Sequence, residues 1–199
     1  MIVSVVSLKG GVGKTTTALH LAAYVAAKGD RVVLVDADPE GSALSWQRLA
    51  RAAQGPLPFE VVRGERASLA RTIRAAAQGA TVILDTPPND REILRTAAYV
   101  SDHVLVPLKP TGLDVDRLMP TLELLADTAA SRGDLDVALL FTHWDAREVL
   151  SQESTRALET YPMLETRVRD LARYKQAFGT RPRYLIEYAK VWKELLADA

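Results

Sequence analysis

The stretch Ser7-Leu8-Lys9-Gly10-Gly11-Val12-Gly13-Lys14-Thr15-Thr16-Thr17 decides how this chain folds. An apolar run typical of a strand, Met1 to Ser7, precedes it, and an alanine- and leucine-rich pattern typical of a helix, Thr15 to Lys28, follows it. A strand, a glycine-rich loop and a helix in this order are the setting of a phosphate-binding loop. The pattern therefore predicts a polyphosphate site at the start of a helix.

Each residue type in this loop has a physical reason to be there. The glycines leave room for several backbone N–H groups to point inward at a phosphate. Lys14 can supply a positive charge to the β- and γ-phosphates, and the hydroxyl of Thr15 can bind Mg²⁺. The start of the helix adds free N–H groups and the positive end of its dipole. We therefore expect the phosphates of a nucleotide to bind at Lys9, Gly10, Gly11, Val12, Gly13, Lys14, Thr15 and Thr16.

Composition limits the possible classes of protein. The chain has 199 residues, 48% of them hydrophobic, and no linker rich in Pro, Gly or Ser, so we expect a single domain over residues 1–199. Its formal net charge is zero, so any DNA contact must be a local patch. It has no cysteine, which excludes disulfides and thiolate metal sites. With no signal peptide before Ile2 and no apolar run of about 18 residues, we expect a cytoplasmic protein without stable membrane association.

Two further apolar runs end in carboxylates. One leads to Asp36-Ala37-Asp38-Pro39, and the other leads to Asp85-Thr86-Pro87-Pro88. Open α/β sheets bind ligands at the carboxyl ends of their strands, and Mg²⁺ prefers a few carboxylates while it keeps its waters. These carboxylates could therefore serve a ligand site, but Asp38 could instead be the cap of the following helix.

The alternation of strands and helices predicts an α/β fold, a doubly wound, mostly parallel sheet with helices on both faces. We expect a helix over Ser42–Gln54, with Ser42 as its cap and Trp46 in packing, and a strand over Phe59–Val62 at or near an edge. A later helix either begins near Met119 with Pro120 in its first turn or is kinked by that proline. The amphipathic pattern over 182–199 predicts a final helix that packs against the sheet rather than on a membrane.

The loop departs from the strict pattern G-x-x-x-x-G-K-[ST], because Leu8 replaces its first glycine and a second lysine stands at position 9. In this it resembles the deviant loop of the ParA/MinD superfamily of ATPases. The resemblance covers nearly the whole chain and is closest to the short, ParF-like partition proteins without an N-terminal DNA-binding domain. It implies ATP and Mg²⁺ as cofactors and a homodimer that closes face to face around ATP.

The resemblance also implies a role for each site residue. Lys14 would bind phosphate, Lys9 would reach across the dimer interface to the partner's ATP, and Asp38 would position the attacking water. The Mg²⁺ ion would be organised by Thr15, Asp36 and Asp85. The segment Asn89 to Arg95 corresponds to a switch that senses the γ-phosphate, Val106 to Asp114 to the dimer-facing loop, and His143 to Arg147 to a turn near the base. His143 itself is either an acid–base group or a partly exposed loop residue.

A basic segment lies near the C-terminal end of the chain. Six cations stand against Glu165 and Asp170, a local charge of six minus two, or +4, with Tyr174 and Tyr184 among them. Such a segment can grip DNA phosphates without reading bases, as comparable arginines do in related ATPases, or it can be a solvated surface. The cations are Arg167, Arg169, Arg173, Lys175, Arg181 and Arg183.

The resemblance therefore implies a slow ATPase, stimulated by a ParB-like or other adaptor protein. Its ATP-bound dimer would bind DNA nonspecifically, associate with the nucleoid and segregate a plasmid or chromosome. Positioning of another cargo, such as a carboxysome or a chemoreceptor cluster, would use the same chemistry. The same superfamily also contains small-molecule ATP-dependent synthetases and membrane-bound MinD-like proteins, and the sequence is compatible with both. It leaves the cargo, the partner and the residues that contact adenine open.

Overall fold

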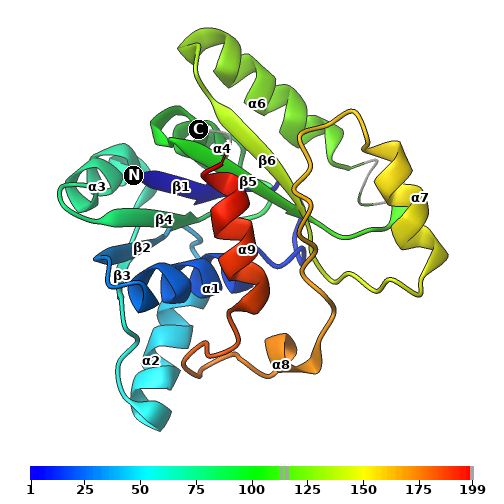
Figure 1. The fold of residues 1–199 in the computed structure, drawn as a ribbon. Coiled ribbons are helices and arrows are strands. Elements are labelled where there is room, and N and C mark those ends of the chain that lie inside the picture. Colours follow the sequence, from blue (N-terminus) through cyan, green and yellow to red (C-terminus); the bar gives the residue numbers. More distant parts are fainter. Residues whose placement is uncertain (113, 115–116, 198–199) are drawn as a thin grey trace.

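The computed structural model describes residues 1–112, 114 and 117–197, except the side chains of residues 149–151. Within these residues, six strands form one sheet in the order β3-β2-β4-β1-β5-β6 (Figure 1). All neighbouring strands are parallel. The predicted doubly wound α/β fold is confirmed. The strands are β1 Ile2–Val5, β2 Val32–Asp36, β3 Glu60–Arg63, β4 Thr81–Asp85, β5 His103–Leu108 and β6 Asp136–Phe141.

Helices cover both faces of the sheet (Figure 1). The helices on one face are α1 (Lys14–Ala27), α2 (Ser42–Gln54) and α9 (Ile186–Leu195). Those on the other are α3 (Leu69–Ala76), which follows a 3₁₀ turn at Arg66–Ser68, α4 (Arg91–Val100) and α6 (Met119–Arg132). The long connection from β6 to α9 carries two short helices, α7 (Val149–Ala157) and α8 (Ala172–Lys175).

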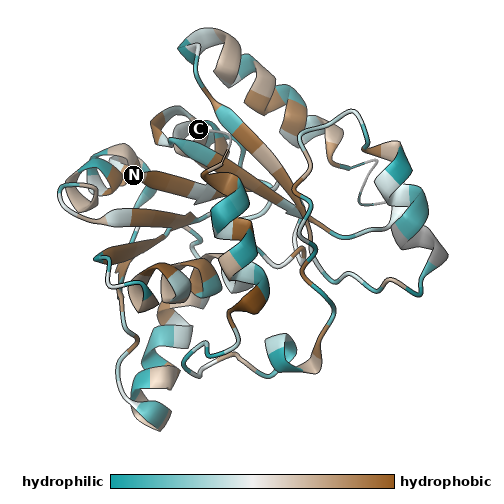
Figure 2. Ribbon diagram, in the orientation of Figure 1, coloured by the Kyte–Doolittle hydropathy of each residue, from teal (hydrophilic) through white to brown (hydrophobic). Residues whose placement is uncertain are grey.

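The apolar runs of the sequence become strands that are buried on both faces. All residues of β2 are buried. Leu34 packs into the core on the α1 side of the sheet, and Val33 and Val35 pack into the core on the α4 side. Figure 2 shows the sheet as a largely hydrophobic layer between helices whose outer faces are more polar. Because each fully buried aliphatic side chain contributes about 1.5–3 kcal/mol, these two cores fix the strand ends that build the site.

Helix starts and the sheet edge test several predictions. Helix α6 begins at Met119 with Pro120 in its first turn, so the proline starts this helix and does not kink it. The strand expected at an edge is β3, and it is the edge strand. The expectation that Ser42 caps α2 is wrong, because Gly41, with φ 65°, is the N-cap and Ser42 makes no capping hydrogen bond. The positive φ at Gly41 is a conformation that residues with a Cβ rarely adopt, so this turn favours glycine.

The final helix is shorter than predicted. It begins at Ile186 rather than at residue 182, and residues 198–199 lie outside the described part of the chain. The backbone N–H of Arg181 donates to Gln54, and the Arg173 guanidinium lies 4.0 Å from the centre of the Tyr184 ring, which together hold the preceding segment as a loop. The apolar side of α9 is buried in the core on the α1 face of the sheet, where it packs on α1. No helix among the described residues has the length and apolar character needed to cross a membrane.

Candidate nucleotide-binding site

The glycine-rich loop joins β1 to α1, as the sequence predicts. The backbone at Gly11 and Gly13 has φ 73° and 85°, a left-handed conformation that residues with a Cβ rarely adopt. Gly13 is the N-cap of α1, so the first free N–H groups of that helix follow directly after it. On the far side, Thr142 at the end of β6 donates its hydroxyl to the Val12 carbonyl at 2.9 Å and holds the loop against the sheet.

Lys14 is buried at the base of this loop. Its side chain is 7% exposed, and its ammonium donates to the carbonyl of Lys9 at 2.8 Å. Burial lowers the pKa of Lys14, and the carboxylates of Asp85 and Asp38 act in the opposite direction. The ammonium and the two carboxylates therefore share one small region at the carboxyl edge of the sheet.

The register of the sheet brings the carboxylates together. Asp36, the last residue of β2, pairs with Asp85, the last residue of β4. Both oxygens of Asp85 are buried, and within the described part of the chain neither has a hydrogen-bond partner. Burial raises the pKa of Asp85 to about 7, although Thr15 and Lys14 lower it.

This arrangement fits a bound Mg²⁺ ion. A buried carboxylate with two unpartnered oxygens beside a threonine hydroxyl offers the hard oxygen ligands that Mg²⁺ prefers. Among the described residues, no three His, Cys, Asp or Glu side chains gather as a metal cage. An all-protein cage is not needed, because Mg²⁺ keeps several waters and binds phosphate oxygens in nucleotide sites. The residues that fit the ion best are Thr15 and Asp85.

Asp36 and Asp38 lie at the site, and their carboxylates also accept hydrogen bonds from nearby backbone N–H groups. The carboxylate of Asp36 accepts the N–H of Asp38 at 3.2 Å and that of Leu44 at 3.0 Å, and burial raises its pKa. Asp36 therefore fixes the start of α2, and both of its oxygens already have partners. Asp38 accepts the N–H of Glu40 at 3.0 Å and is 9% exposed. Asp38 does not cap α2, because Gly41 is the N-cap.

Lys9 has an ionic partner within its own chain. Its ammonium lies 2.5 Å from a carboxylate oxygen of Asp114, which is 6% exposed and also accepts the hydroxyl of Thr111. Asp114 belongs to the stretch that the sequence identifies as dimer-facing, of which Leu113 lies outside the described residues. Sequence reasoning did not assign this pairing, and no spacing in the sequence indicates it.

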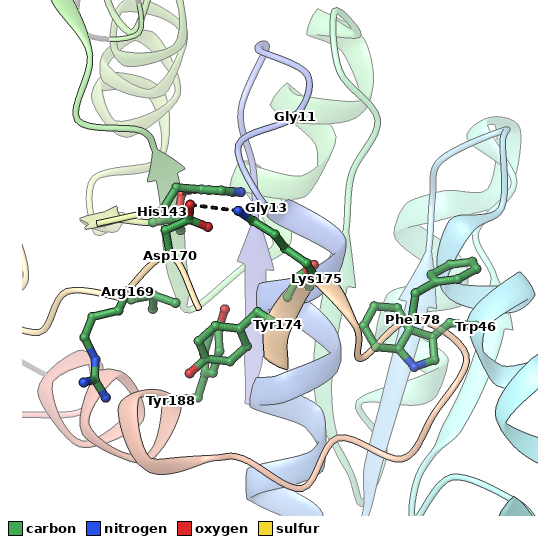
Figure 3. A pocket seen from close by; sticks show the side chains of 13 residues that line it. Gly11, Gly13, Trp46, His143, Arg169, Asp170, Tyr174, Lys175, Phe178 and Tyr188 are labelled. Atoms are coloured by element: carbon green, nitrogen blue, oxygen red, sulfur yellow. Dashed lines mark hydrogen bonds and ion pairs between the residues drawn. The ribbon is translucent and has the colours of Figure 1, made fainter. Parts of the chain in front are cut away.

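A cavity of about 310 Å³ adjoins the loop (Figure 3). Gly11, Gly13 and Thr16 line it on the loop side, and His143 lines it near the end of β6. The half-buried His143 has φ 53°, and burial and Lys109 lower its pKa. It is a partly exposed loop residue, one of the two roles expected for it. The outer wall comes from the C-terminal segment and from α2, with Arg169, Asp170, Tyr174, Lys175, Phe178, Tyr188 and Trp46.

The aromatic wall of this cavity is what the sequence reasoning missed. Trp46 packs as expected, with 2% of its surface exposed, and it donates its ring N–H to the Thr180 carbonyl at 2.7 Å. It also meets the ring of Phe178 at 5.4 Å between centroids, and Figure 3 shows the two side by side. The sequence did contain an indication of this wall, because aromatic residues stand among the C-terminal arginines. Aromatic rings can stack on a nucleotide base as well as pack beside arginines.

The six predicted DNA-binding cations differ in their partners and in the hollows that they line. Arg167 is half buried, donates to backbone carbonyls of residues 164 and 165, and lies 5.4 Å from the ring centres of Phe141 and Trp144. Arg169 pairs with the buried Glu187 at 2.5 Å. Lys175 pairs with Asp170 at 2.9 Å and, like Arg169, lines the cavity beside the loop.

The other three cations line a second hollow, next to Tyr184, whose hydroxyl accepts from Arg169 at 2.8 Å and whose ring lies 4.0 Å from the Arg173 guanidinium. This hollow has a volume of about 260 Å³, and its further walls include His20 and Gln54. The Nε atom of Arg181 is buried there and, within the described residues, has no hydrogen-bond partner. Burial lowers the pKa of His20 to about 4, so the ring is neutral at pH 7. The three cations are Arg173, Arg181 and Arg183.

Comparison with known proteins agrees with this geometry. The model of the CobQ/CobB/MinD/ParA nucleotide binding domain matches residues 3–182. A maintenance of carboxysome distribution protein A from Gloeobacter kilaueensis is 41% identical over 122 residues, which cover 61% of this chain and only 55% of that protein. The chromosome-partitioning ATPase Soj of Thermus thermophilus is 30% identical over 189 residues, covering 80% of this chain and 76% of Soj.

A solved structure supports the fold. A putative plasmid partition protein from Borrelia burgdorferi, bound to AMPPNP, superposes with a TM-score of 0.81 and covers 100% of this chain and 99% of its own. The two sequences are 17% identical, so this likeness concerns the fold alone.

Proposed function

This chain belongs to the CobQ/CobB/MinD/ParA nucleotide-binding domain family, and on that premise we propose that it is an ATPase that uses ATP as a switch. The observation that carries the proposal is the buried carboxylate of Asp85, unpartnered within the described chain and beside Thr15 at the foot of the glycine-rich loop. A buried carboxylate without a partner is costly, and a bound cation removes that cost.

Each part of the site has a task in phosphoryl transfer to water. Lys14 would hold the phosphates, and Thr15 with Asp85 would hold Mg²⁺, which would supply positive charge against the phosphates. Asp38 has one oxygen bonded to the backbone of Glu40, which fixes the carboxylate for a role in positioning water. This is catalysis by positioning and electrostatics.

The cavity beside the loop is the proposed place for the base and ribose. It opens from the loop at Gly11 and Thr16 toward the aromatic rings of Tyr174 and Phe178. Aromatic faces accept a base by stacking. Asp170 and Lys175 add polar groups at the same wall, which is the usual composition of a cofactor pocket.

Dimer closure requires Lys9 to change partner. In the described structure the ammonium is held by Asp114 of the same chain, at 2.5 Å. If Lys9 acts on a partner subunit's ATP, this ion pair must open first. The developing phosphate charge on that ATP would replace the carboxylate that Lys9 loses.

For the DNA-bound state, the hollow lined by Arg173, Arg181 and Arg183 is the proposed phosphate contact. No carboxylate is among the described residues that line it, and Arg183 is exposed there. Arginine forks suit phosphodiesters, and such contacts give sequence-independent binding. A ParB-like or other adaptor protein would then stimulate hydrolysis, and the DNA would be released. The protein would therefore be on the nucleoid while it is an ATP-bound dimer and free in the cytoplasm for the rest of the cycle.

Two cargo classes fit this cycle. Partition of a plasmid or chromosome is favoured by the similarity to Soj, which aligns over most of both chains. Positioning of a carboxysome or another assembly is favoured by the higher identity to the carboxysome distribution protein over a shorter region. Both classes share the same ATP and DNA chemistry.

The test is binding of a random-sequence DNA duplex with ATP, ADP or no nucleotide at two salt concentrations, alongside ATP hydrolysis. We expect binding with ATP only, weakened by salt. Asp38→Ala should keep ATP-dependent DNA binding while hydrolysis falls by roughly 10²-fold. Hydrolysis at the parent rate in that variant would remove Asp38 from the mechanism. Hydrolysis without any DNA binding would favour a small-molecule synthetase instead.

A further inference from the structure

A hollow of about 430 Å³ lies between α3, α4 and α6, on the face of the sheet opposite α1 and α9. The half-buried Ala70 and Thr96 leave space between α3 and α4, and Tyr99, with 54% of its surface exposed, stands on the rim. A second hollow of about 620 Å³ along α3 shares Ala70, Arg74 and Thr96 with the first. The two hollows therefore form one groove along the pair of helices.

Unpaired positive charge surrounds this groove. Arg71 and Arg74 of α3 and Arg95 of α4 line it and are exposed, and in the described part of the chain none of the three pairs with a carboxylate. Arg66 differs, because its guanidinium pairs with Asp90 and with Glu92 at the start of α4. Carboxylates of a partner would therefore meet free guanidinium groups along the groove.

The shape of the groove distinguishes between two kinds of anionic partner. A rigid DNA duplex would rest on the rim and leave the hollow empty. A protein helix can place apolar side chains into the hollow, beside Tyr99 and Val100, while its own carboxylates face the arginines. We propose that this groove docks an acidic amphipathic helix of a partner protein.

The groove is connected to the nucleotide loop through α4. The residues just before that helix contact the loop, because Asn89 donates its N–H to the Leu8 carbonyl at 2.9 Å. A Cβ at Gly10 would lie 3.7 Å from the side chain of Pro88. A partner held against α4 thus binds an element whose first turn adjoins the phosphate site. That this partner is the adaptor of the ATP cycle rests on the proposed function, whereas the docking itself does not.

The experiment uses a defined probe and the nucleotide-free protein. The probe is a fluorescein-labelled peptide of about 15 residues, four helical turns, with leucines on one face and glutamates on the other. Its match has lysines in place of the glutamates. Fluorescence anisotropy should show binding of the acidic peptide, weakened between about 50 and 300 mM salt, and no binding of the basic one.

Matched variants test the place of binding. The double change Arg71→Glu and Arg74→Glu should weaken the acidic peptide about tenfold or more, or about 1.4 kcal/mol. Ala70→Trp, which fills the hollow without a change of charge, should also weaken it. Arg48→Glu, an exposed arginine of α2 on the other face, should leave it unchanged. Circular dichroism establishes that each variant is folded.

Three outcomes of the peptide assay would overturn the proposal: no binding of the acidic peptide, equal binding of the basic peptide, or unchanged binding by the α3 double variant. Random-sequence duplex DNA is tested on the same variants. Loss of DNA binding with Arg71→Glu and Arg74→Glu would assign the surface to nucleic acid and would likewise overturn the proposal that it docks a helix. Because the peptide assay contains no nucleotide, its failure leaves the ATPase and DNA measurements of the proposed function untouched.

Discussion

The glycine-rich loop and the C-terminal segment from Asp170 to Phe178 both line the cavity beside the phosphate site, but they reach it in different ways. The loop is placed locally, because β1 and α1 flank it directly in the sequence. The C-terminal segment is placed by distant contacts, such as the bond from Trp46 to the carbonyl of Thr180 and the pairing of Arg169 with Glu187. The loop can be recognised as a motif because its neighbours in the sequence place it. For the cavity wall, the sequence shows which residue types are present but not where they lie.

The largest expected effect lies in the local region. Lys14→Ala should lower ATP hydrolysis and nucleotide affinity on the order of 10²-fold or more, because the only buried ammonium at the phosphate loop among the described residues is removed. Folding should not suffer, since burial already opposes the charge of Lys14. A fluorescent ATP analogue and a phosphate-release assay measure both quantities. Retention of parent affinity would show that the loop does not hold the phosphates.

The aromatic wall should give the next largest effect. Tyr174→Leu should weaken ATP binding about tenfold, since base stacking on an aromatic ring contributes about 1–3 kcal/mol. Tyr174→Phe keeps the ring and should restore most of the affinity, although it loses the hydroxyl bond to Glu187. Tyr99→Leu, on the opposite face, is the control. Equal affinities for Tyr174→Leu and the parent would place the base outside this cavity.

The buried carboxylate predicts a pH-dependent stability. Because burial raises the pKa of Asp85 from 3.8 to about 7, the folded chain holds a proton there that the unfolded chain has released. This group therefore lowers the free energy of unfolding as pH rises from about 4 to 7. Without Mg²⁺, the Tm gain from Asp85→Asn should be small at pH 5 and larger at pH 8. A gain for Asp85→Asn that is independent of pH would contradict the assignment.

The smallest expected effects divide the C-terminal cations. Arg183→Ala should weaken DNA binding a few-fold, reduce the salt slope by about 1 and leave ATP affinity unchanged. Lys175→Ala, on the wall beside the loop, should weaken ATP binding more than DNA binding. DNA titrations at two salt concentrations with a saturating ATP analogue separate the two. The same loss of DNA affinity in both variants would restore the single basic patch that the sequence suggests.

Some of the site follows from sequence because it depends on strand ends. Asp36 and Asp85 each end an apolar run, and in a parallel sheet such ends meet at one edge, so their proximity could be predicted. Their different environments could not. Asp36 gives both oxygens to backbone N–H groups of the next turn and helix, whereas Asp85 keeps two unpartnered oxygens in the described chain.

By itself the sequence determined the fold class, the phosphate loop and the order of the carboxylates. Each of these depends on a pattern within a few neighbouring residues: the period of the hydrophobic residues, the positions of the glycines, and the residues at which apolar runs end. Only the tertiary structure decided the partner of Lys9, the division of the C-terminal cations and the groove between α3, α4 and α6. The reason is physical: an ion pair such as Lys9 with Asp114, or an orphaned donor such as Arg181 Nε in the described chain, depends on which distant side chains packing brings within about 3 Å.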